Sequence, residues 1–261
     1  MRILITNDDG INAPGLATLQ HIAEDIAGDP ELVTIVAPAF EQSGVAHCIS
    51  YAHPTLISKM GARRYAIEGS PADCVLAAVH VVMKDAPPDL ILSGVNRGNN
   101  SAENAMYSGT LGGAMEGALQ DIPSIALSQF FGPRNKDLND PFESARAFGP
   151  DAVRKILAQD PGAQDGYRLF YNVNFPPVSA AETLSLRPAA QGKRPNTRFS
   201  AIEQTSPTGR SFLWAKGGDQ QVPTAPGSDA AVNLQGYVSI TPMRANLTDY
   251  DALSRLEDAL A

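Results

Sequence analysis

The chain has 261 residues and a formal net charge of −8, with 43% hydrophobic and 18% charged residues. This composition is typical of a globular protein with ample core, and the acidic balance argues against polymeric nucleic acid as a partner. There is no apolar stretch of about 18 residues and no basic-then-apolar leader, so we expect no membrane span, membrane partner or signal peptide. Cys48 and Cys74 lie in apolar segments without metal-ligand spacing, which predicts core thiols in a reducing cytoplasm.

Strand-like and helix-like segments alternate along most of the chain with short connections. One helix begins at Pro14, carries apolar residues on one face and ends at Gly28, a common helix stop. Such alternation predicts an α/β fold with a mostly parallel sheet covered on both faces. The predicted strands are 1–7, 32–37, 90–92, 122–127 and 168–173, and the predicted helices are 14–27, 71–83, 110–119 and 141–159.

The sequence changes character after Pro177, where Pro, Gly, Ser, Thr and Gln become frequent. Two extended segments, 197–205 and 211–216, flank a Pro-Thr-Gly turn and predict a protruding β-hairpin arm. Because an isolated hairpin is marginally stable, we expect Phe212 and Trp214 to contact another subunit or to cover the active site. A hairpin that faces the core of its own subunit is the alternative.

A strand at 236–242 and an amphipathic helix at 250–261 complete the predicted elements. The region after Pro177 has too few core residues for an independent domain. We therefore expect 1–261 to form a single unit, with a core of about 1–178 and an arm and oligomerisation segment of about 179–261.

Oxygen-bearing side chains follow three of the predicted strands. Asp8 and Asp9 end the first strand, Ser43 lies in the loop after the second, and Asn96 lies in the loop after the third. The carboxyl ends of parallel strands share one sheet edge, so these side chains can converge there. Carboxylate, hydroxyl and amide oxygens suit Mg²⁺, Mn²⁺ or Ca²⁺ rather than zinc. The alternative is that the acidic pair only caps the following helix. His47 lies near the second loop and could reach the site.

The segment from Tyr107 to Gly113 leads into a helix and is rich in glycine and hydroxyl residues. Free backbone N–H groups at a helix start attract anions, so Ser108, Gly109 and Thr110 are predicted to bind a phosphoryl group. Small residues that only allow close helix packing are the alternative. No serine–histidine pair has a useful spacing, which favours attack by water. Asp8 and Asp9 are the predicted catalytic residues. Either carboxylate could transfer the proton of the attacking water, and both assignments remain open.

Six segments, in order along the chain, resemble the survival protein SurE family of metal-dependent nucleoside monophosphate phosphatases. They are ITNDDG at 5–10, APAFEQSG at 37–44, GSPADCV at 69–75, SGVNRGNN at 93–100, YSGT at 107–110 and GYVSITP at 236–242. Two departures are a serine at 70, where threonine is common, and an asparagine at 246, where aspartate is frequent.

The resemblance implies a Rossmann-like three-layer sandwich and a homodimer or homotetramer with exchanged C-terminal elements. It also implies one divalent metal ion per subunit, Mg²⁺ or Mn²⁺, bound at Asp8, Asp9, Ser43 and Asn96. The implied activity is cytoplasmic hydrolysis of 5′- and 3′-nucleotides, sometimes with short polyphosphate. Two rival hypotheses are a dinucleotide-binding dehydrogenase and a non-catalytic metal-binding interaction protein. The acidic turn after the first strand argues against the dehydrogenase, which needs glycines there.

Overall fold

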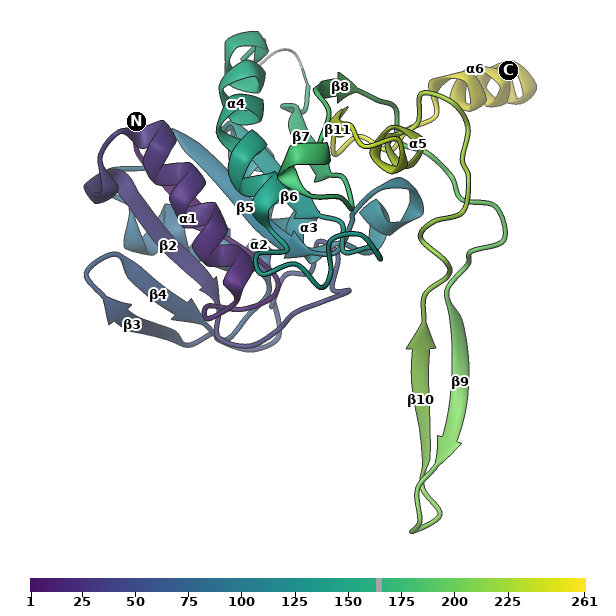
Figure 1. The fold of residues 1–261 in the computed structure, drawn as a ribbon, viewed down its shortest axis with the longest axis horizontal. Coiled ribbons are helices and arrows are strands. Elements are labelled where there is room, and N and C mark those ends of the chain that lie inside the picture. Colours follow the sequence, from purple (N-terminus) through teal and green to yellow (C-terminus); the bar gives the residue numbers. More distant parts are fainter. Residues whose placement is uncertain (163–165) are drawn as a thin grey trace.

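The computed structural model describes residues 1–162 and 166–261, and its central feature is a nine-stranded sheet (Figure 1). The strand order is β3-β4-β2-β1-β5-β6-β7-β11-β8, and a separate two-stranded sheet pairs β9 with β10. The strands are β1 (Ile3–Thr6), β2 (Val33–Pro38), β3 (Ile57–Gly61), β4 (Arg64–Ile67), β5 (Leu90–Arg97), β6 (Ser124–Gln129), β7 (Phe170–Phe175), β8 (Leu186–Pro188), β9 (Ser200–Thr205), β10 (Ser211–Lys216) and β11 (Val238–Met243).

The central strands β4, β2, β1, β5, β6 and β7 are mutually parallel, which confirms the predicted mostly parallel sheet. Strands β3 and β11 run antiparallel to their neighbours β4 and β7. The α-helices are α1 (Pro14–Ala27), α2 (Pro71–Ala77), α3 (Gly109–Leu119), α4 (Glu143–Gln159), α5 (Asp229–Leu234) and α6 (Tyr250–Leu260). Helices α1 and α4 cover one face of the sheet, and α2 and α3 cover the other, as the predicted three layers require.

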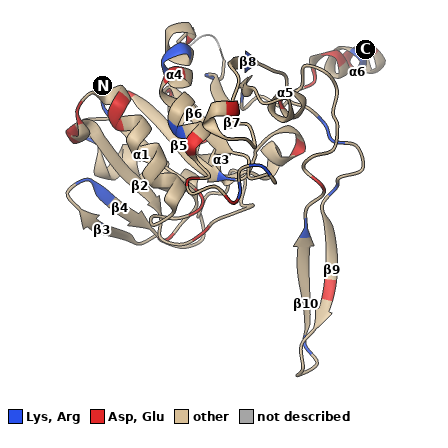
Figure 2. Cartoon of the chain, viewed as in Figure 1, with Lys and Arg blue, Asp and Glu red and all other residues tan. Residues whose placement is uncertain are grey.

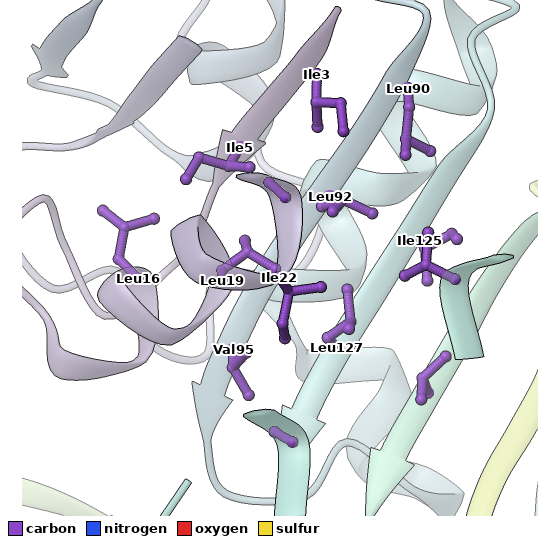
Figure 3. Close-up of a cluster of buried hydrophobic side chains, with 14 of the residues drawn as sticks. Ile3, Ile5, Leu16, Leu19, Ile22, Leu90, Leu92, Val95, Ile125 and Leu127 are labelled. Atoms are coloured by element: carbon purple, nitrogen blue, oxygen red, sulfur yellow. The ribbon is translucent and has the colours of Figure 1, made fainter. Parts of the chain in front are cut away.

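Helices cover both faces of the parallel strands, and successive side chains alternate between these faces, so every residue of β1 is buried. On one face, Ile3 and Ile5 of β1 pack with Leu19 of α1 (Figure 3). On the other face, Leu4 packs against a cluster that includes Val75 of α2. This double burial explains why the strands read as continuous apolar runs, and it holds the strand ends in fixed positions.

Local sequence signals set several element boundaries. Helix α1 occupies the predicted residues, and Gly28 ends it in a left-handed conformation, with its N–H bonded to Glu24 O. Ser70 and Asp73 form a reciprocal capping box at the start of α2. This helix is shorter than predicted, because the segment Ala78–Val82 continues it as a π-helix.

The arm formed by β9 and β10 projects away from the core (Figure 1), and every residue of both strands is exposed. The alternative of a core-facing hairpin is therefore wrong for this chain. Phe212 and Trp214 retain 53% and 61% exposure. Charged residues of both signs lie on the arm as well as on the rest of the fold (Figure 2). The arm thus presents an uncovered aromatic surface.

The prediction of two core thiols is half wrong. Cys74 is buried in α2, but Cys48 is exposed, because its apolar neighbours lie in an irregular loop rather than in a packed element. Neither cysteine is in a disulfide. Among the described residues, none of the helices has the length and apolar character that a bilayer crossing requires.

Candidate functional site

The carboxyl ends of β1, β2 and β5 place the predicted oxygen ligands at one edge of the sheet. Asp8, Ser43 and Asn96 line one cavity of about 320 Å³, together with Ser108. Asp9 and Ser43 line a second, adjoining cavity of about 890 Å³, and Arg97 contributes to both. A backbone hydrogen bond of 2.7 Å from Gln42 N to Asp8 O ties the Ser43 loop to the acidic pair. The four predicted ligands therefore line two cavities that share Ser43 and Arg97 in their walls.

The two aspartates lie in an environment that disfavours their negative charge. Burial raises the pKa of Asp8 from 3.8 to about 7; the hydrogen bond from Thr110 opposes this rise and the charge of Asp9 adds to it. Burial also raises the pKa of Asp9, against an opposing hydrogen bond from the Arg97 N–H and with the charge of Glu41 adding to the rise. A cation between the carboxylates would relieve this cost, so the site fits a divalent metal ion.

The hydrogen bonds of the two neutral predicted ligands leave acceptor oxygens free for a cation. Ser43 Oγ donates to Glu41 Oε1 at 2.8 Å, which leaves lone pairs on the hydroxyl oxygen. Asn96 Nδ2 donates to Gly98 O at 3.0 Å, so the amide oxygen is turned to the opposite side. Within 1–162 and 166–261, no three His, Cys, Asp or Glu residues cluster in a metal-binding arrangement. The donor set is therefore two carboxylates with neutral oxygens, which suits a hard cation.

The start of α3 meets the acidic pair directly. The Thr110 hydroxyl donates to Asp8 Oδ1 at 2.7 Å, and Thr110 is fully buried. A Cβ on Gly109 would lie 3.0 Å from Asp8 Cβ and 3.1 Å from Gln42 O, so a larger residue would require Asp8 or the Gln42 backbone to shift by a few tenths of an ångström. Ser108 caps the helix by accepting from Leu111 N at 3.1 Å, and it lines the smaller cavity. Of the three predicted phosphate-binding residues, Thr110 thus faces Asp8, while Ser108 faces the cavity.

His47 does not line either cavity. It pairs with Glu116 of α3, with 2.7 Å between Nε2 and Oε2. This contact anchors the loop after β2 to α3 and leaves the cavity walls without histidine.

A network of buried asparagine side chains lies behind Thr110 and holds its hydroxyl in place. Asn100 Nδ2 donates to Thr110 Oγ1 at 3.3 Å and to Ser128 Oγ at 2.8 Å. Asn100 N donates to Asn174 Oδ1 at 2.7 Å, and Asn172 Nδ2 donates to Asn100 O at 2.9 Å. Satisfied buried networks are rigid, so this one fixes the position of the Thr110 hydroxyl against Asp8.

Several residues that line the smaller cavity were not predicted from the sequence as site residues. They are Asn99, Asn100, Asn104, Tyr107 and Phe199. Tyr107 and Phe199 form a ring pair with centroids 4.6 Å apart, which joins the base of the arm to the cavity. The density of asparagines after β5 is a sequence signal for the first three, but nothing local in the sequence connects Phe199 to this wall.

These features define a class of α/β proteins. In this class, two aspartates at the end of a parallel strand lie next to the first turn of a helix, beside a small cavity lined by polar residues. A family model described as "Survival protein SurE" matches residues 3–198, so the chain belongs to the SurE family, and the predicted family is confirmed.

Similar proteins with this family name span the whole chain. The "5′-nucleotidase SurE" of Ruegeria pomeroyi is 68% identical over 260 residues and covers 100% of both chains. The protein of the same name from Roseobacter denitrificans is 63% identical over 256 residues, 98% of each chain. The crystal structure of SurE protein from Aquifex aeolicus has a TM-score of 0.80 and 33% identity, and covers 100% of both chains.

Proposed function

We propose that this protein is a metal-dependent phosphatase that hydrolyses nucleoside 5′-monophosphates, and also 3′-monophosphates, to nucleoside and phosphate. The names of its relatives support the 5′-nucleotidase activity. The observation that carries the proposal is the 2.7 Å hydrogen bond from Thr110 to Asp8. It joins the acidic strand end to the start of α3, which supports a proposed cation site beside a proposed anion site.

We propose Asp8, Asp9, Ser43 and Asn96 as the ligands of one Mg²⁺ or Mn²⁺ ion per subunit. When bound, the ion supplies positive charge that polarises the phosphoryl group and stabilises its transition state. Asp9 Oδ2 accepts from the Arg97 N–H at 3.0 Å, which orients the carboxylate. This orientation leaves its other oxygen available to bind the cation or to accept a proton from the attacking water.

The phosphoryl oxygens are held, in this proposal, by the start of α3. The Gly109 N–H belongs to the first helical turn and has no intrahelical acceptor. Ser108 adds a hydroxyl at the cavity wall. Thr110 acts mainly by orienting Asp8, because its hydroxyl already donates to that carboxylate. Such preorganised donors stabilise charge that develops in the transition state.

Water is the nucleophile that the side chains favour. The Ser43 hydroxyl donates to Glu41 and the Ser108 hydroxyl oxygen caps α3, so neither serine is paired with a histidine base. The dinucleotide-binding alternative lacks support at the same place, because the turn after β1 presents Asp8 and Asp9 where a pyrophosphate would need glycine N–H groups.

We further propose a homodimer or homotetramer in the cytoplasm, assembled through the arm and the C-terminal helix α6. Helix α6 has no buried residue, and its Leu253, Leu256 and Leu260 are exposed. Exposed aromatic and leucine side chains in such number are typical of interface anchors.

The proposed activity is tested by phosphate release from a panel of nucleotides and short polyphosphates with Mg²⁺ and Mn²⁺. We expect metal-dependent release from 5′-monophosphates above all. Absence of release from every nucleotide with either metal would refute the proposal.

A further inference from the structure

The Asn99 carboxamide lies in the wall of the smaller cavity, and its orientation is fixed by donors behind it. Its Oδ1 accepts from Arg194 Nη2 at 2.9 Å and from Ser101 Oγ at 2.8 Å. A guanidinium has only donors, so the atom that faces Arg194 must be the amide oxygen. The NH₂ group of Asn99 is therefore turned away from Arg194.

This NH₂ group is an unused donor. Asn99 is only 7% exposed, and its Nδ2 donates to no protein acceptor in the described part of the chain. The residue shares the cavity with Asp8, Asn96 and Ser108. Asn99 Nδ2 is not among the described side-chain atoms that are both fully buried and unpartnered, so it remains accessible from the cavity, where an acceptor oxygen of a bound molecule can bind it.

Arg194 holds this arrangement from the base of the arm. It is 4% exposed, and it also donates to Ser101 O at 3.0 Å and to Ser101 Oγ at 2.7 Å. Glu103 accepts from Arg194 N at 3.0 Å and from Thr197 Oγ1 at 3.0 Å. Arg194 is 95 residues from Asn99 in the chain, so the arm segment and the loop after β5 are locked together at this point.

We propose that Asn99 is a substrate-binding residue whose NH₂ group donates to an acceptor oxygen of the nucleotide, and that Arg194 is its positioning residue. The oxygen belongs to the phosphoryl group or to a sugar hydroxyl; both are acceptors. This inference rests on the proposed nucleotidase function.

The test compares kcat and KM of the metal-loaded, full-length protein on a nucleoside 5′-monophosphate and on p-nitrophenyl phosphate. Asn99→Ala removes one hydrogen bond, so we expect kcat/KM on the nucleotide to fall about 3- to 10-fold, mostly through KM. Asn99→Asp keeps the oxygen that Arg194 binds but replaces the NH₂ donor by an acceptor oxygen. We therefore expect kcat/KM on the nucleotide to fall further in Asn99→Asp than in Asn99→Ala.

The two substrates distinguish the two sources of the acceptor oxygen. An equal loss on both indicates a phosphoryl oxygen, and a loss confined to the nucleotide indicates a sugar hydroxyl. Asn104→Asp is the matched control for added charge, because it places a negative charge in the same cavity at an amide whose Nδ2 already donates to Gln220 Oε1 at 2.6 Å and to the Asn99 backbone oxygen at 3.5 Å. We expect a smaller loss from Asn104→Asp than from Asn99→Asp.

A double-mutant comparison tests the positioning role of Arg194. We expect Arg194→Lys to raise KM several-fold in the wild-type background and to add nothing in the Asn99→Ala background. Additive effects would overturn the positioning role, and wild-type KM in Asn99→Ala and Asn99→Asp would overturn the binding role. If the wild type releases no phosphate from nucleotides, both the proposed function and this inference are refuted. If the wild type turns over normally and the variants are unaffected, only this inference is refuted.

Discussion

Replacing Asp8 by asparagine should stabilise the metal-free protein while abolishing activity. The pKa of Asp8 rises from 3.8 to about 7 on folding because the carboxyl is buried. The folded state therefore binds the Asp8 proton more tightly than the unfolded state, and the free energy of unfolding falls as the pH rises from about 4 to about 7. At about 1.4 kcal/mol per pKa unit, the rise from 3.8 to about 7 costs about 4 kcal/mol at pH 8.

Asparagine is nearly isosteric, can still accept from Thr110 and carries no charge, so Asp8→Asn should recover most of this cost. For a chain of this size, about 4 kcal/mol corresponds to a rise in Tm of roughly 8 °C. The assay is thermal unfolding of chelator-treated wild type and Asp8→Asn at pH 8 and pH 5. The difference should be largest at pH 8 and less than half as large at pH 5.

Asp89 provides the control, because its pKa is lowered by hydrogen bonds from Arg2. Asp89→Asn should therefore not stabilise the protein at pH 8. Addition of Mn²⁺ should stabilise the wild type but not Asp8→Asn. Equal Tm values for wild type and Asp8→Asn at pH 8 would refute the electrostatic reasoning.

Three further predictions concern the proposed ligands, the anion site and the arm. Asp9→Asn should lose most of the turnover and metal affinity measured by phosphate release and calorimetry; near wild-type turnover with unaltered metal demand would exclude it as a ligand. Thr110→Val removes a hydrogen bond to a carboxylate, so kcat/KM should fall about 10-fold or more; an unchanged value would mean that the contact with Asp8 is dispensable. Deleting 195–217 should weaken assembly, measured by light scattering, and raise KM more than it weakens metal binding; a fully assembled variant with normal KM would show that the arm has neither role.

Periodicity and capping signals in the sequence were sufficient for the elements that carry the site. The apolar strand runs and the helix at Pro14 were predictable because burial on both sheet faces and helix-end residues act locally. The edge strand β3 and its neighbour β4 were missed because β3 is almost wholly exposed and β4 has only four residues, two of them buried, so neither shows a clear two-residue alternation. Helix α5 was missed because six residues are too short for a helical period.

The metal-ligand candidates could be predicted because each lies near the C-terminal end of a predicted strand, whereas the finer geometry could not. Asn96 was expected in a loop after residues 90–92, but β5 continues to Arg97, so Asn96 lies within that strand. The Thr110 hydroxyl points at Asp8 only because the amide network beneath it fixes its direction. The contact of Arg194 with Asn99 joins residues 95 positions apart, and no local sequence pattern predicts it. The exposure of Cys48 depends on the path of an irregular loop, which composition does not specify.

The central claim is that a divalent metal ion at the Asp8–Asp9 site drives phosphate release from nucleotides. The most direct measurement is phosphate release from a nucleoside 5′-monophosphate by metal-stripped protein during titration with Mn²⁺ or Mg²⁺. We expect no turnover before metal is added and saturation as the site fills, with direct binding measurements giving one ion per subunit. Full turnover by the metal-stripped protein, unchanged by added metal, would contradict the claim.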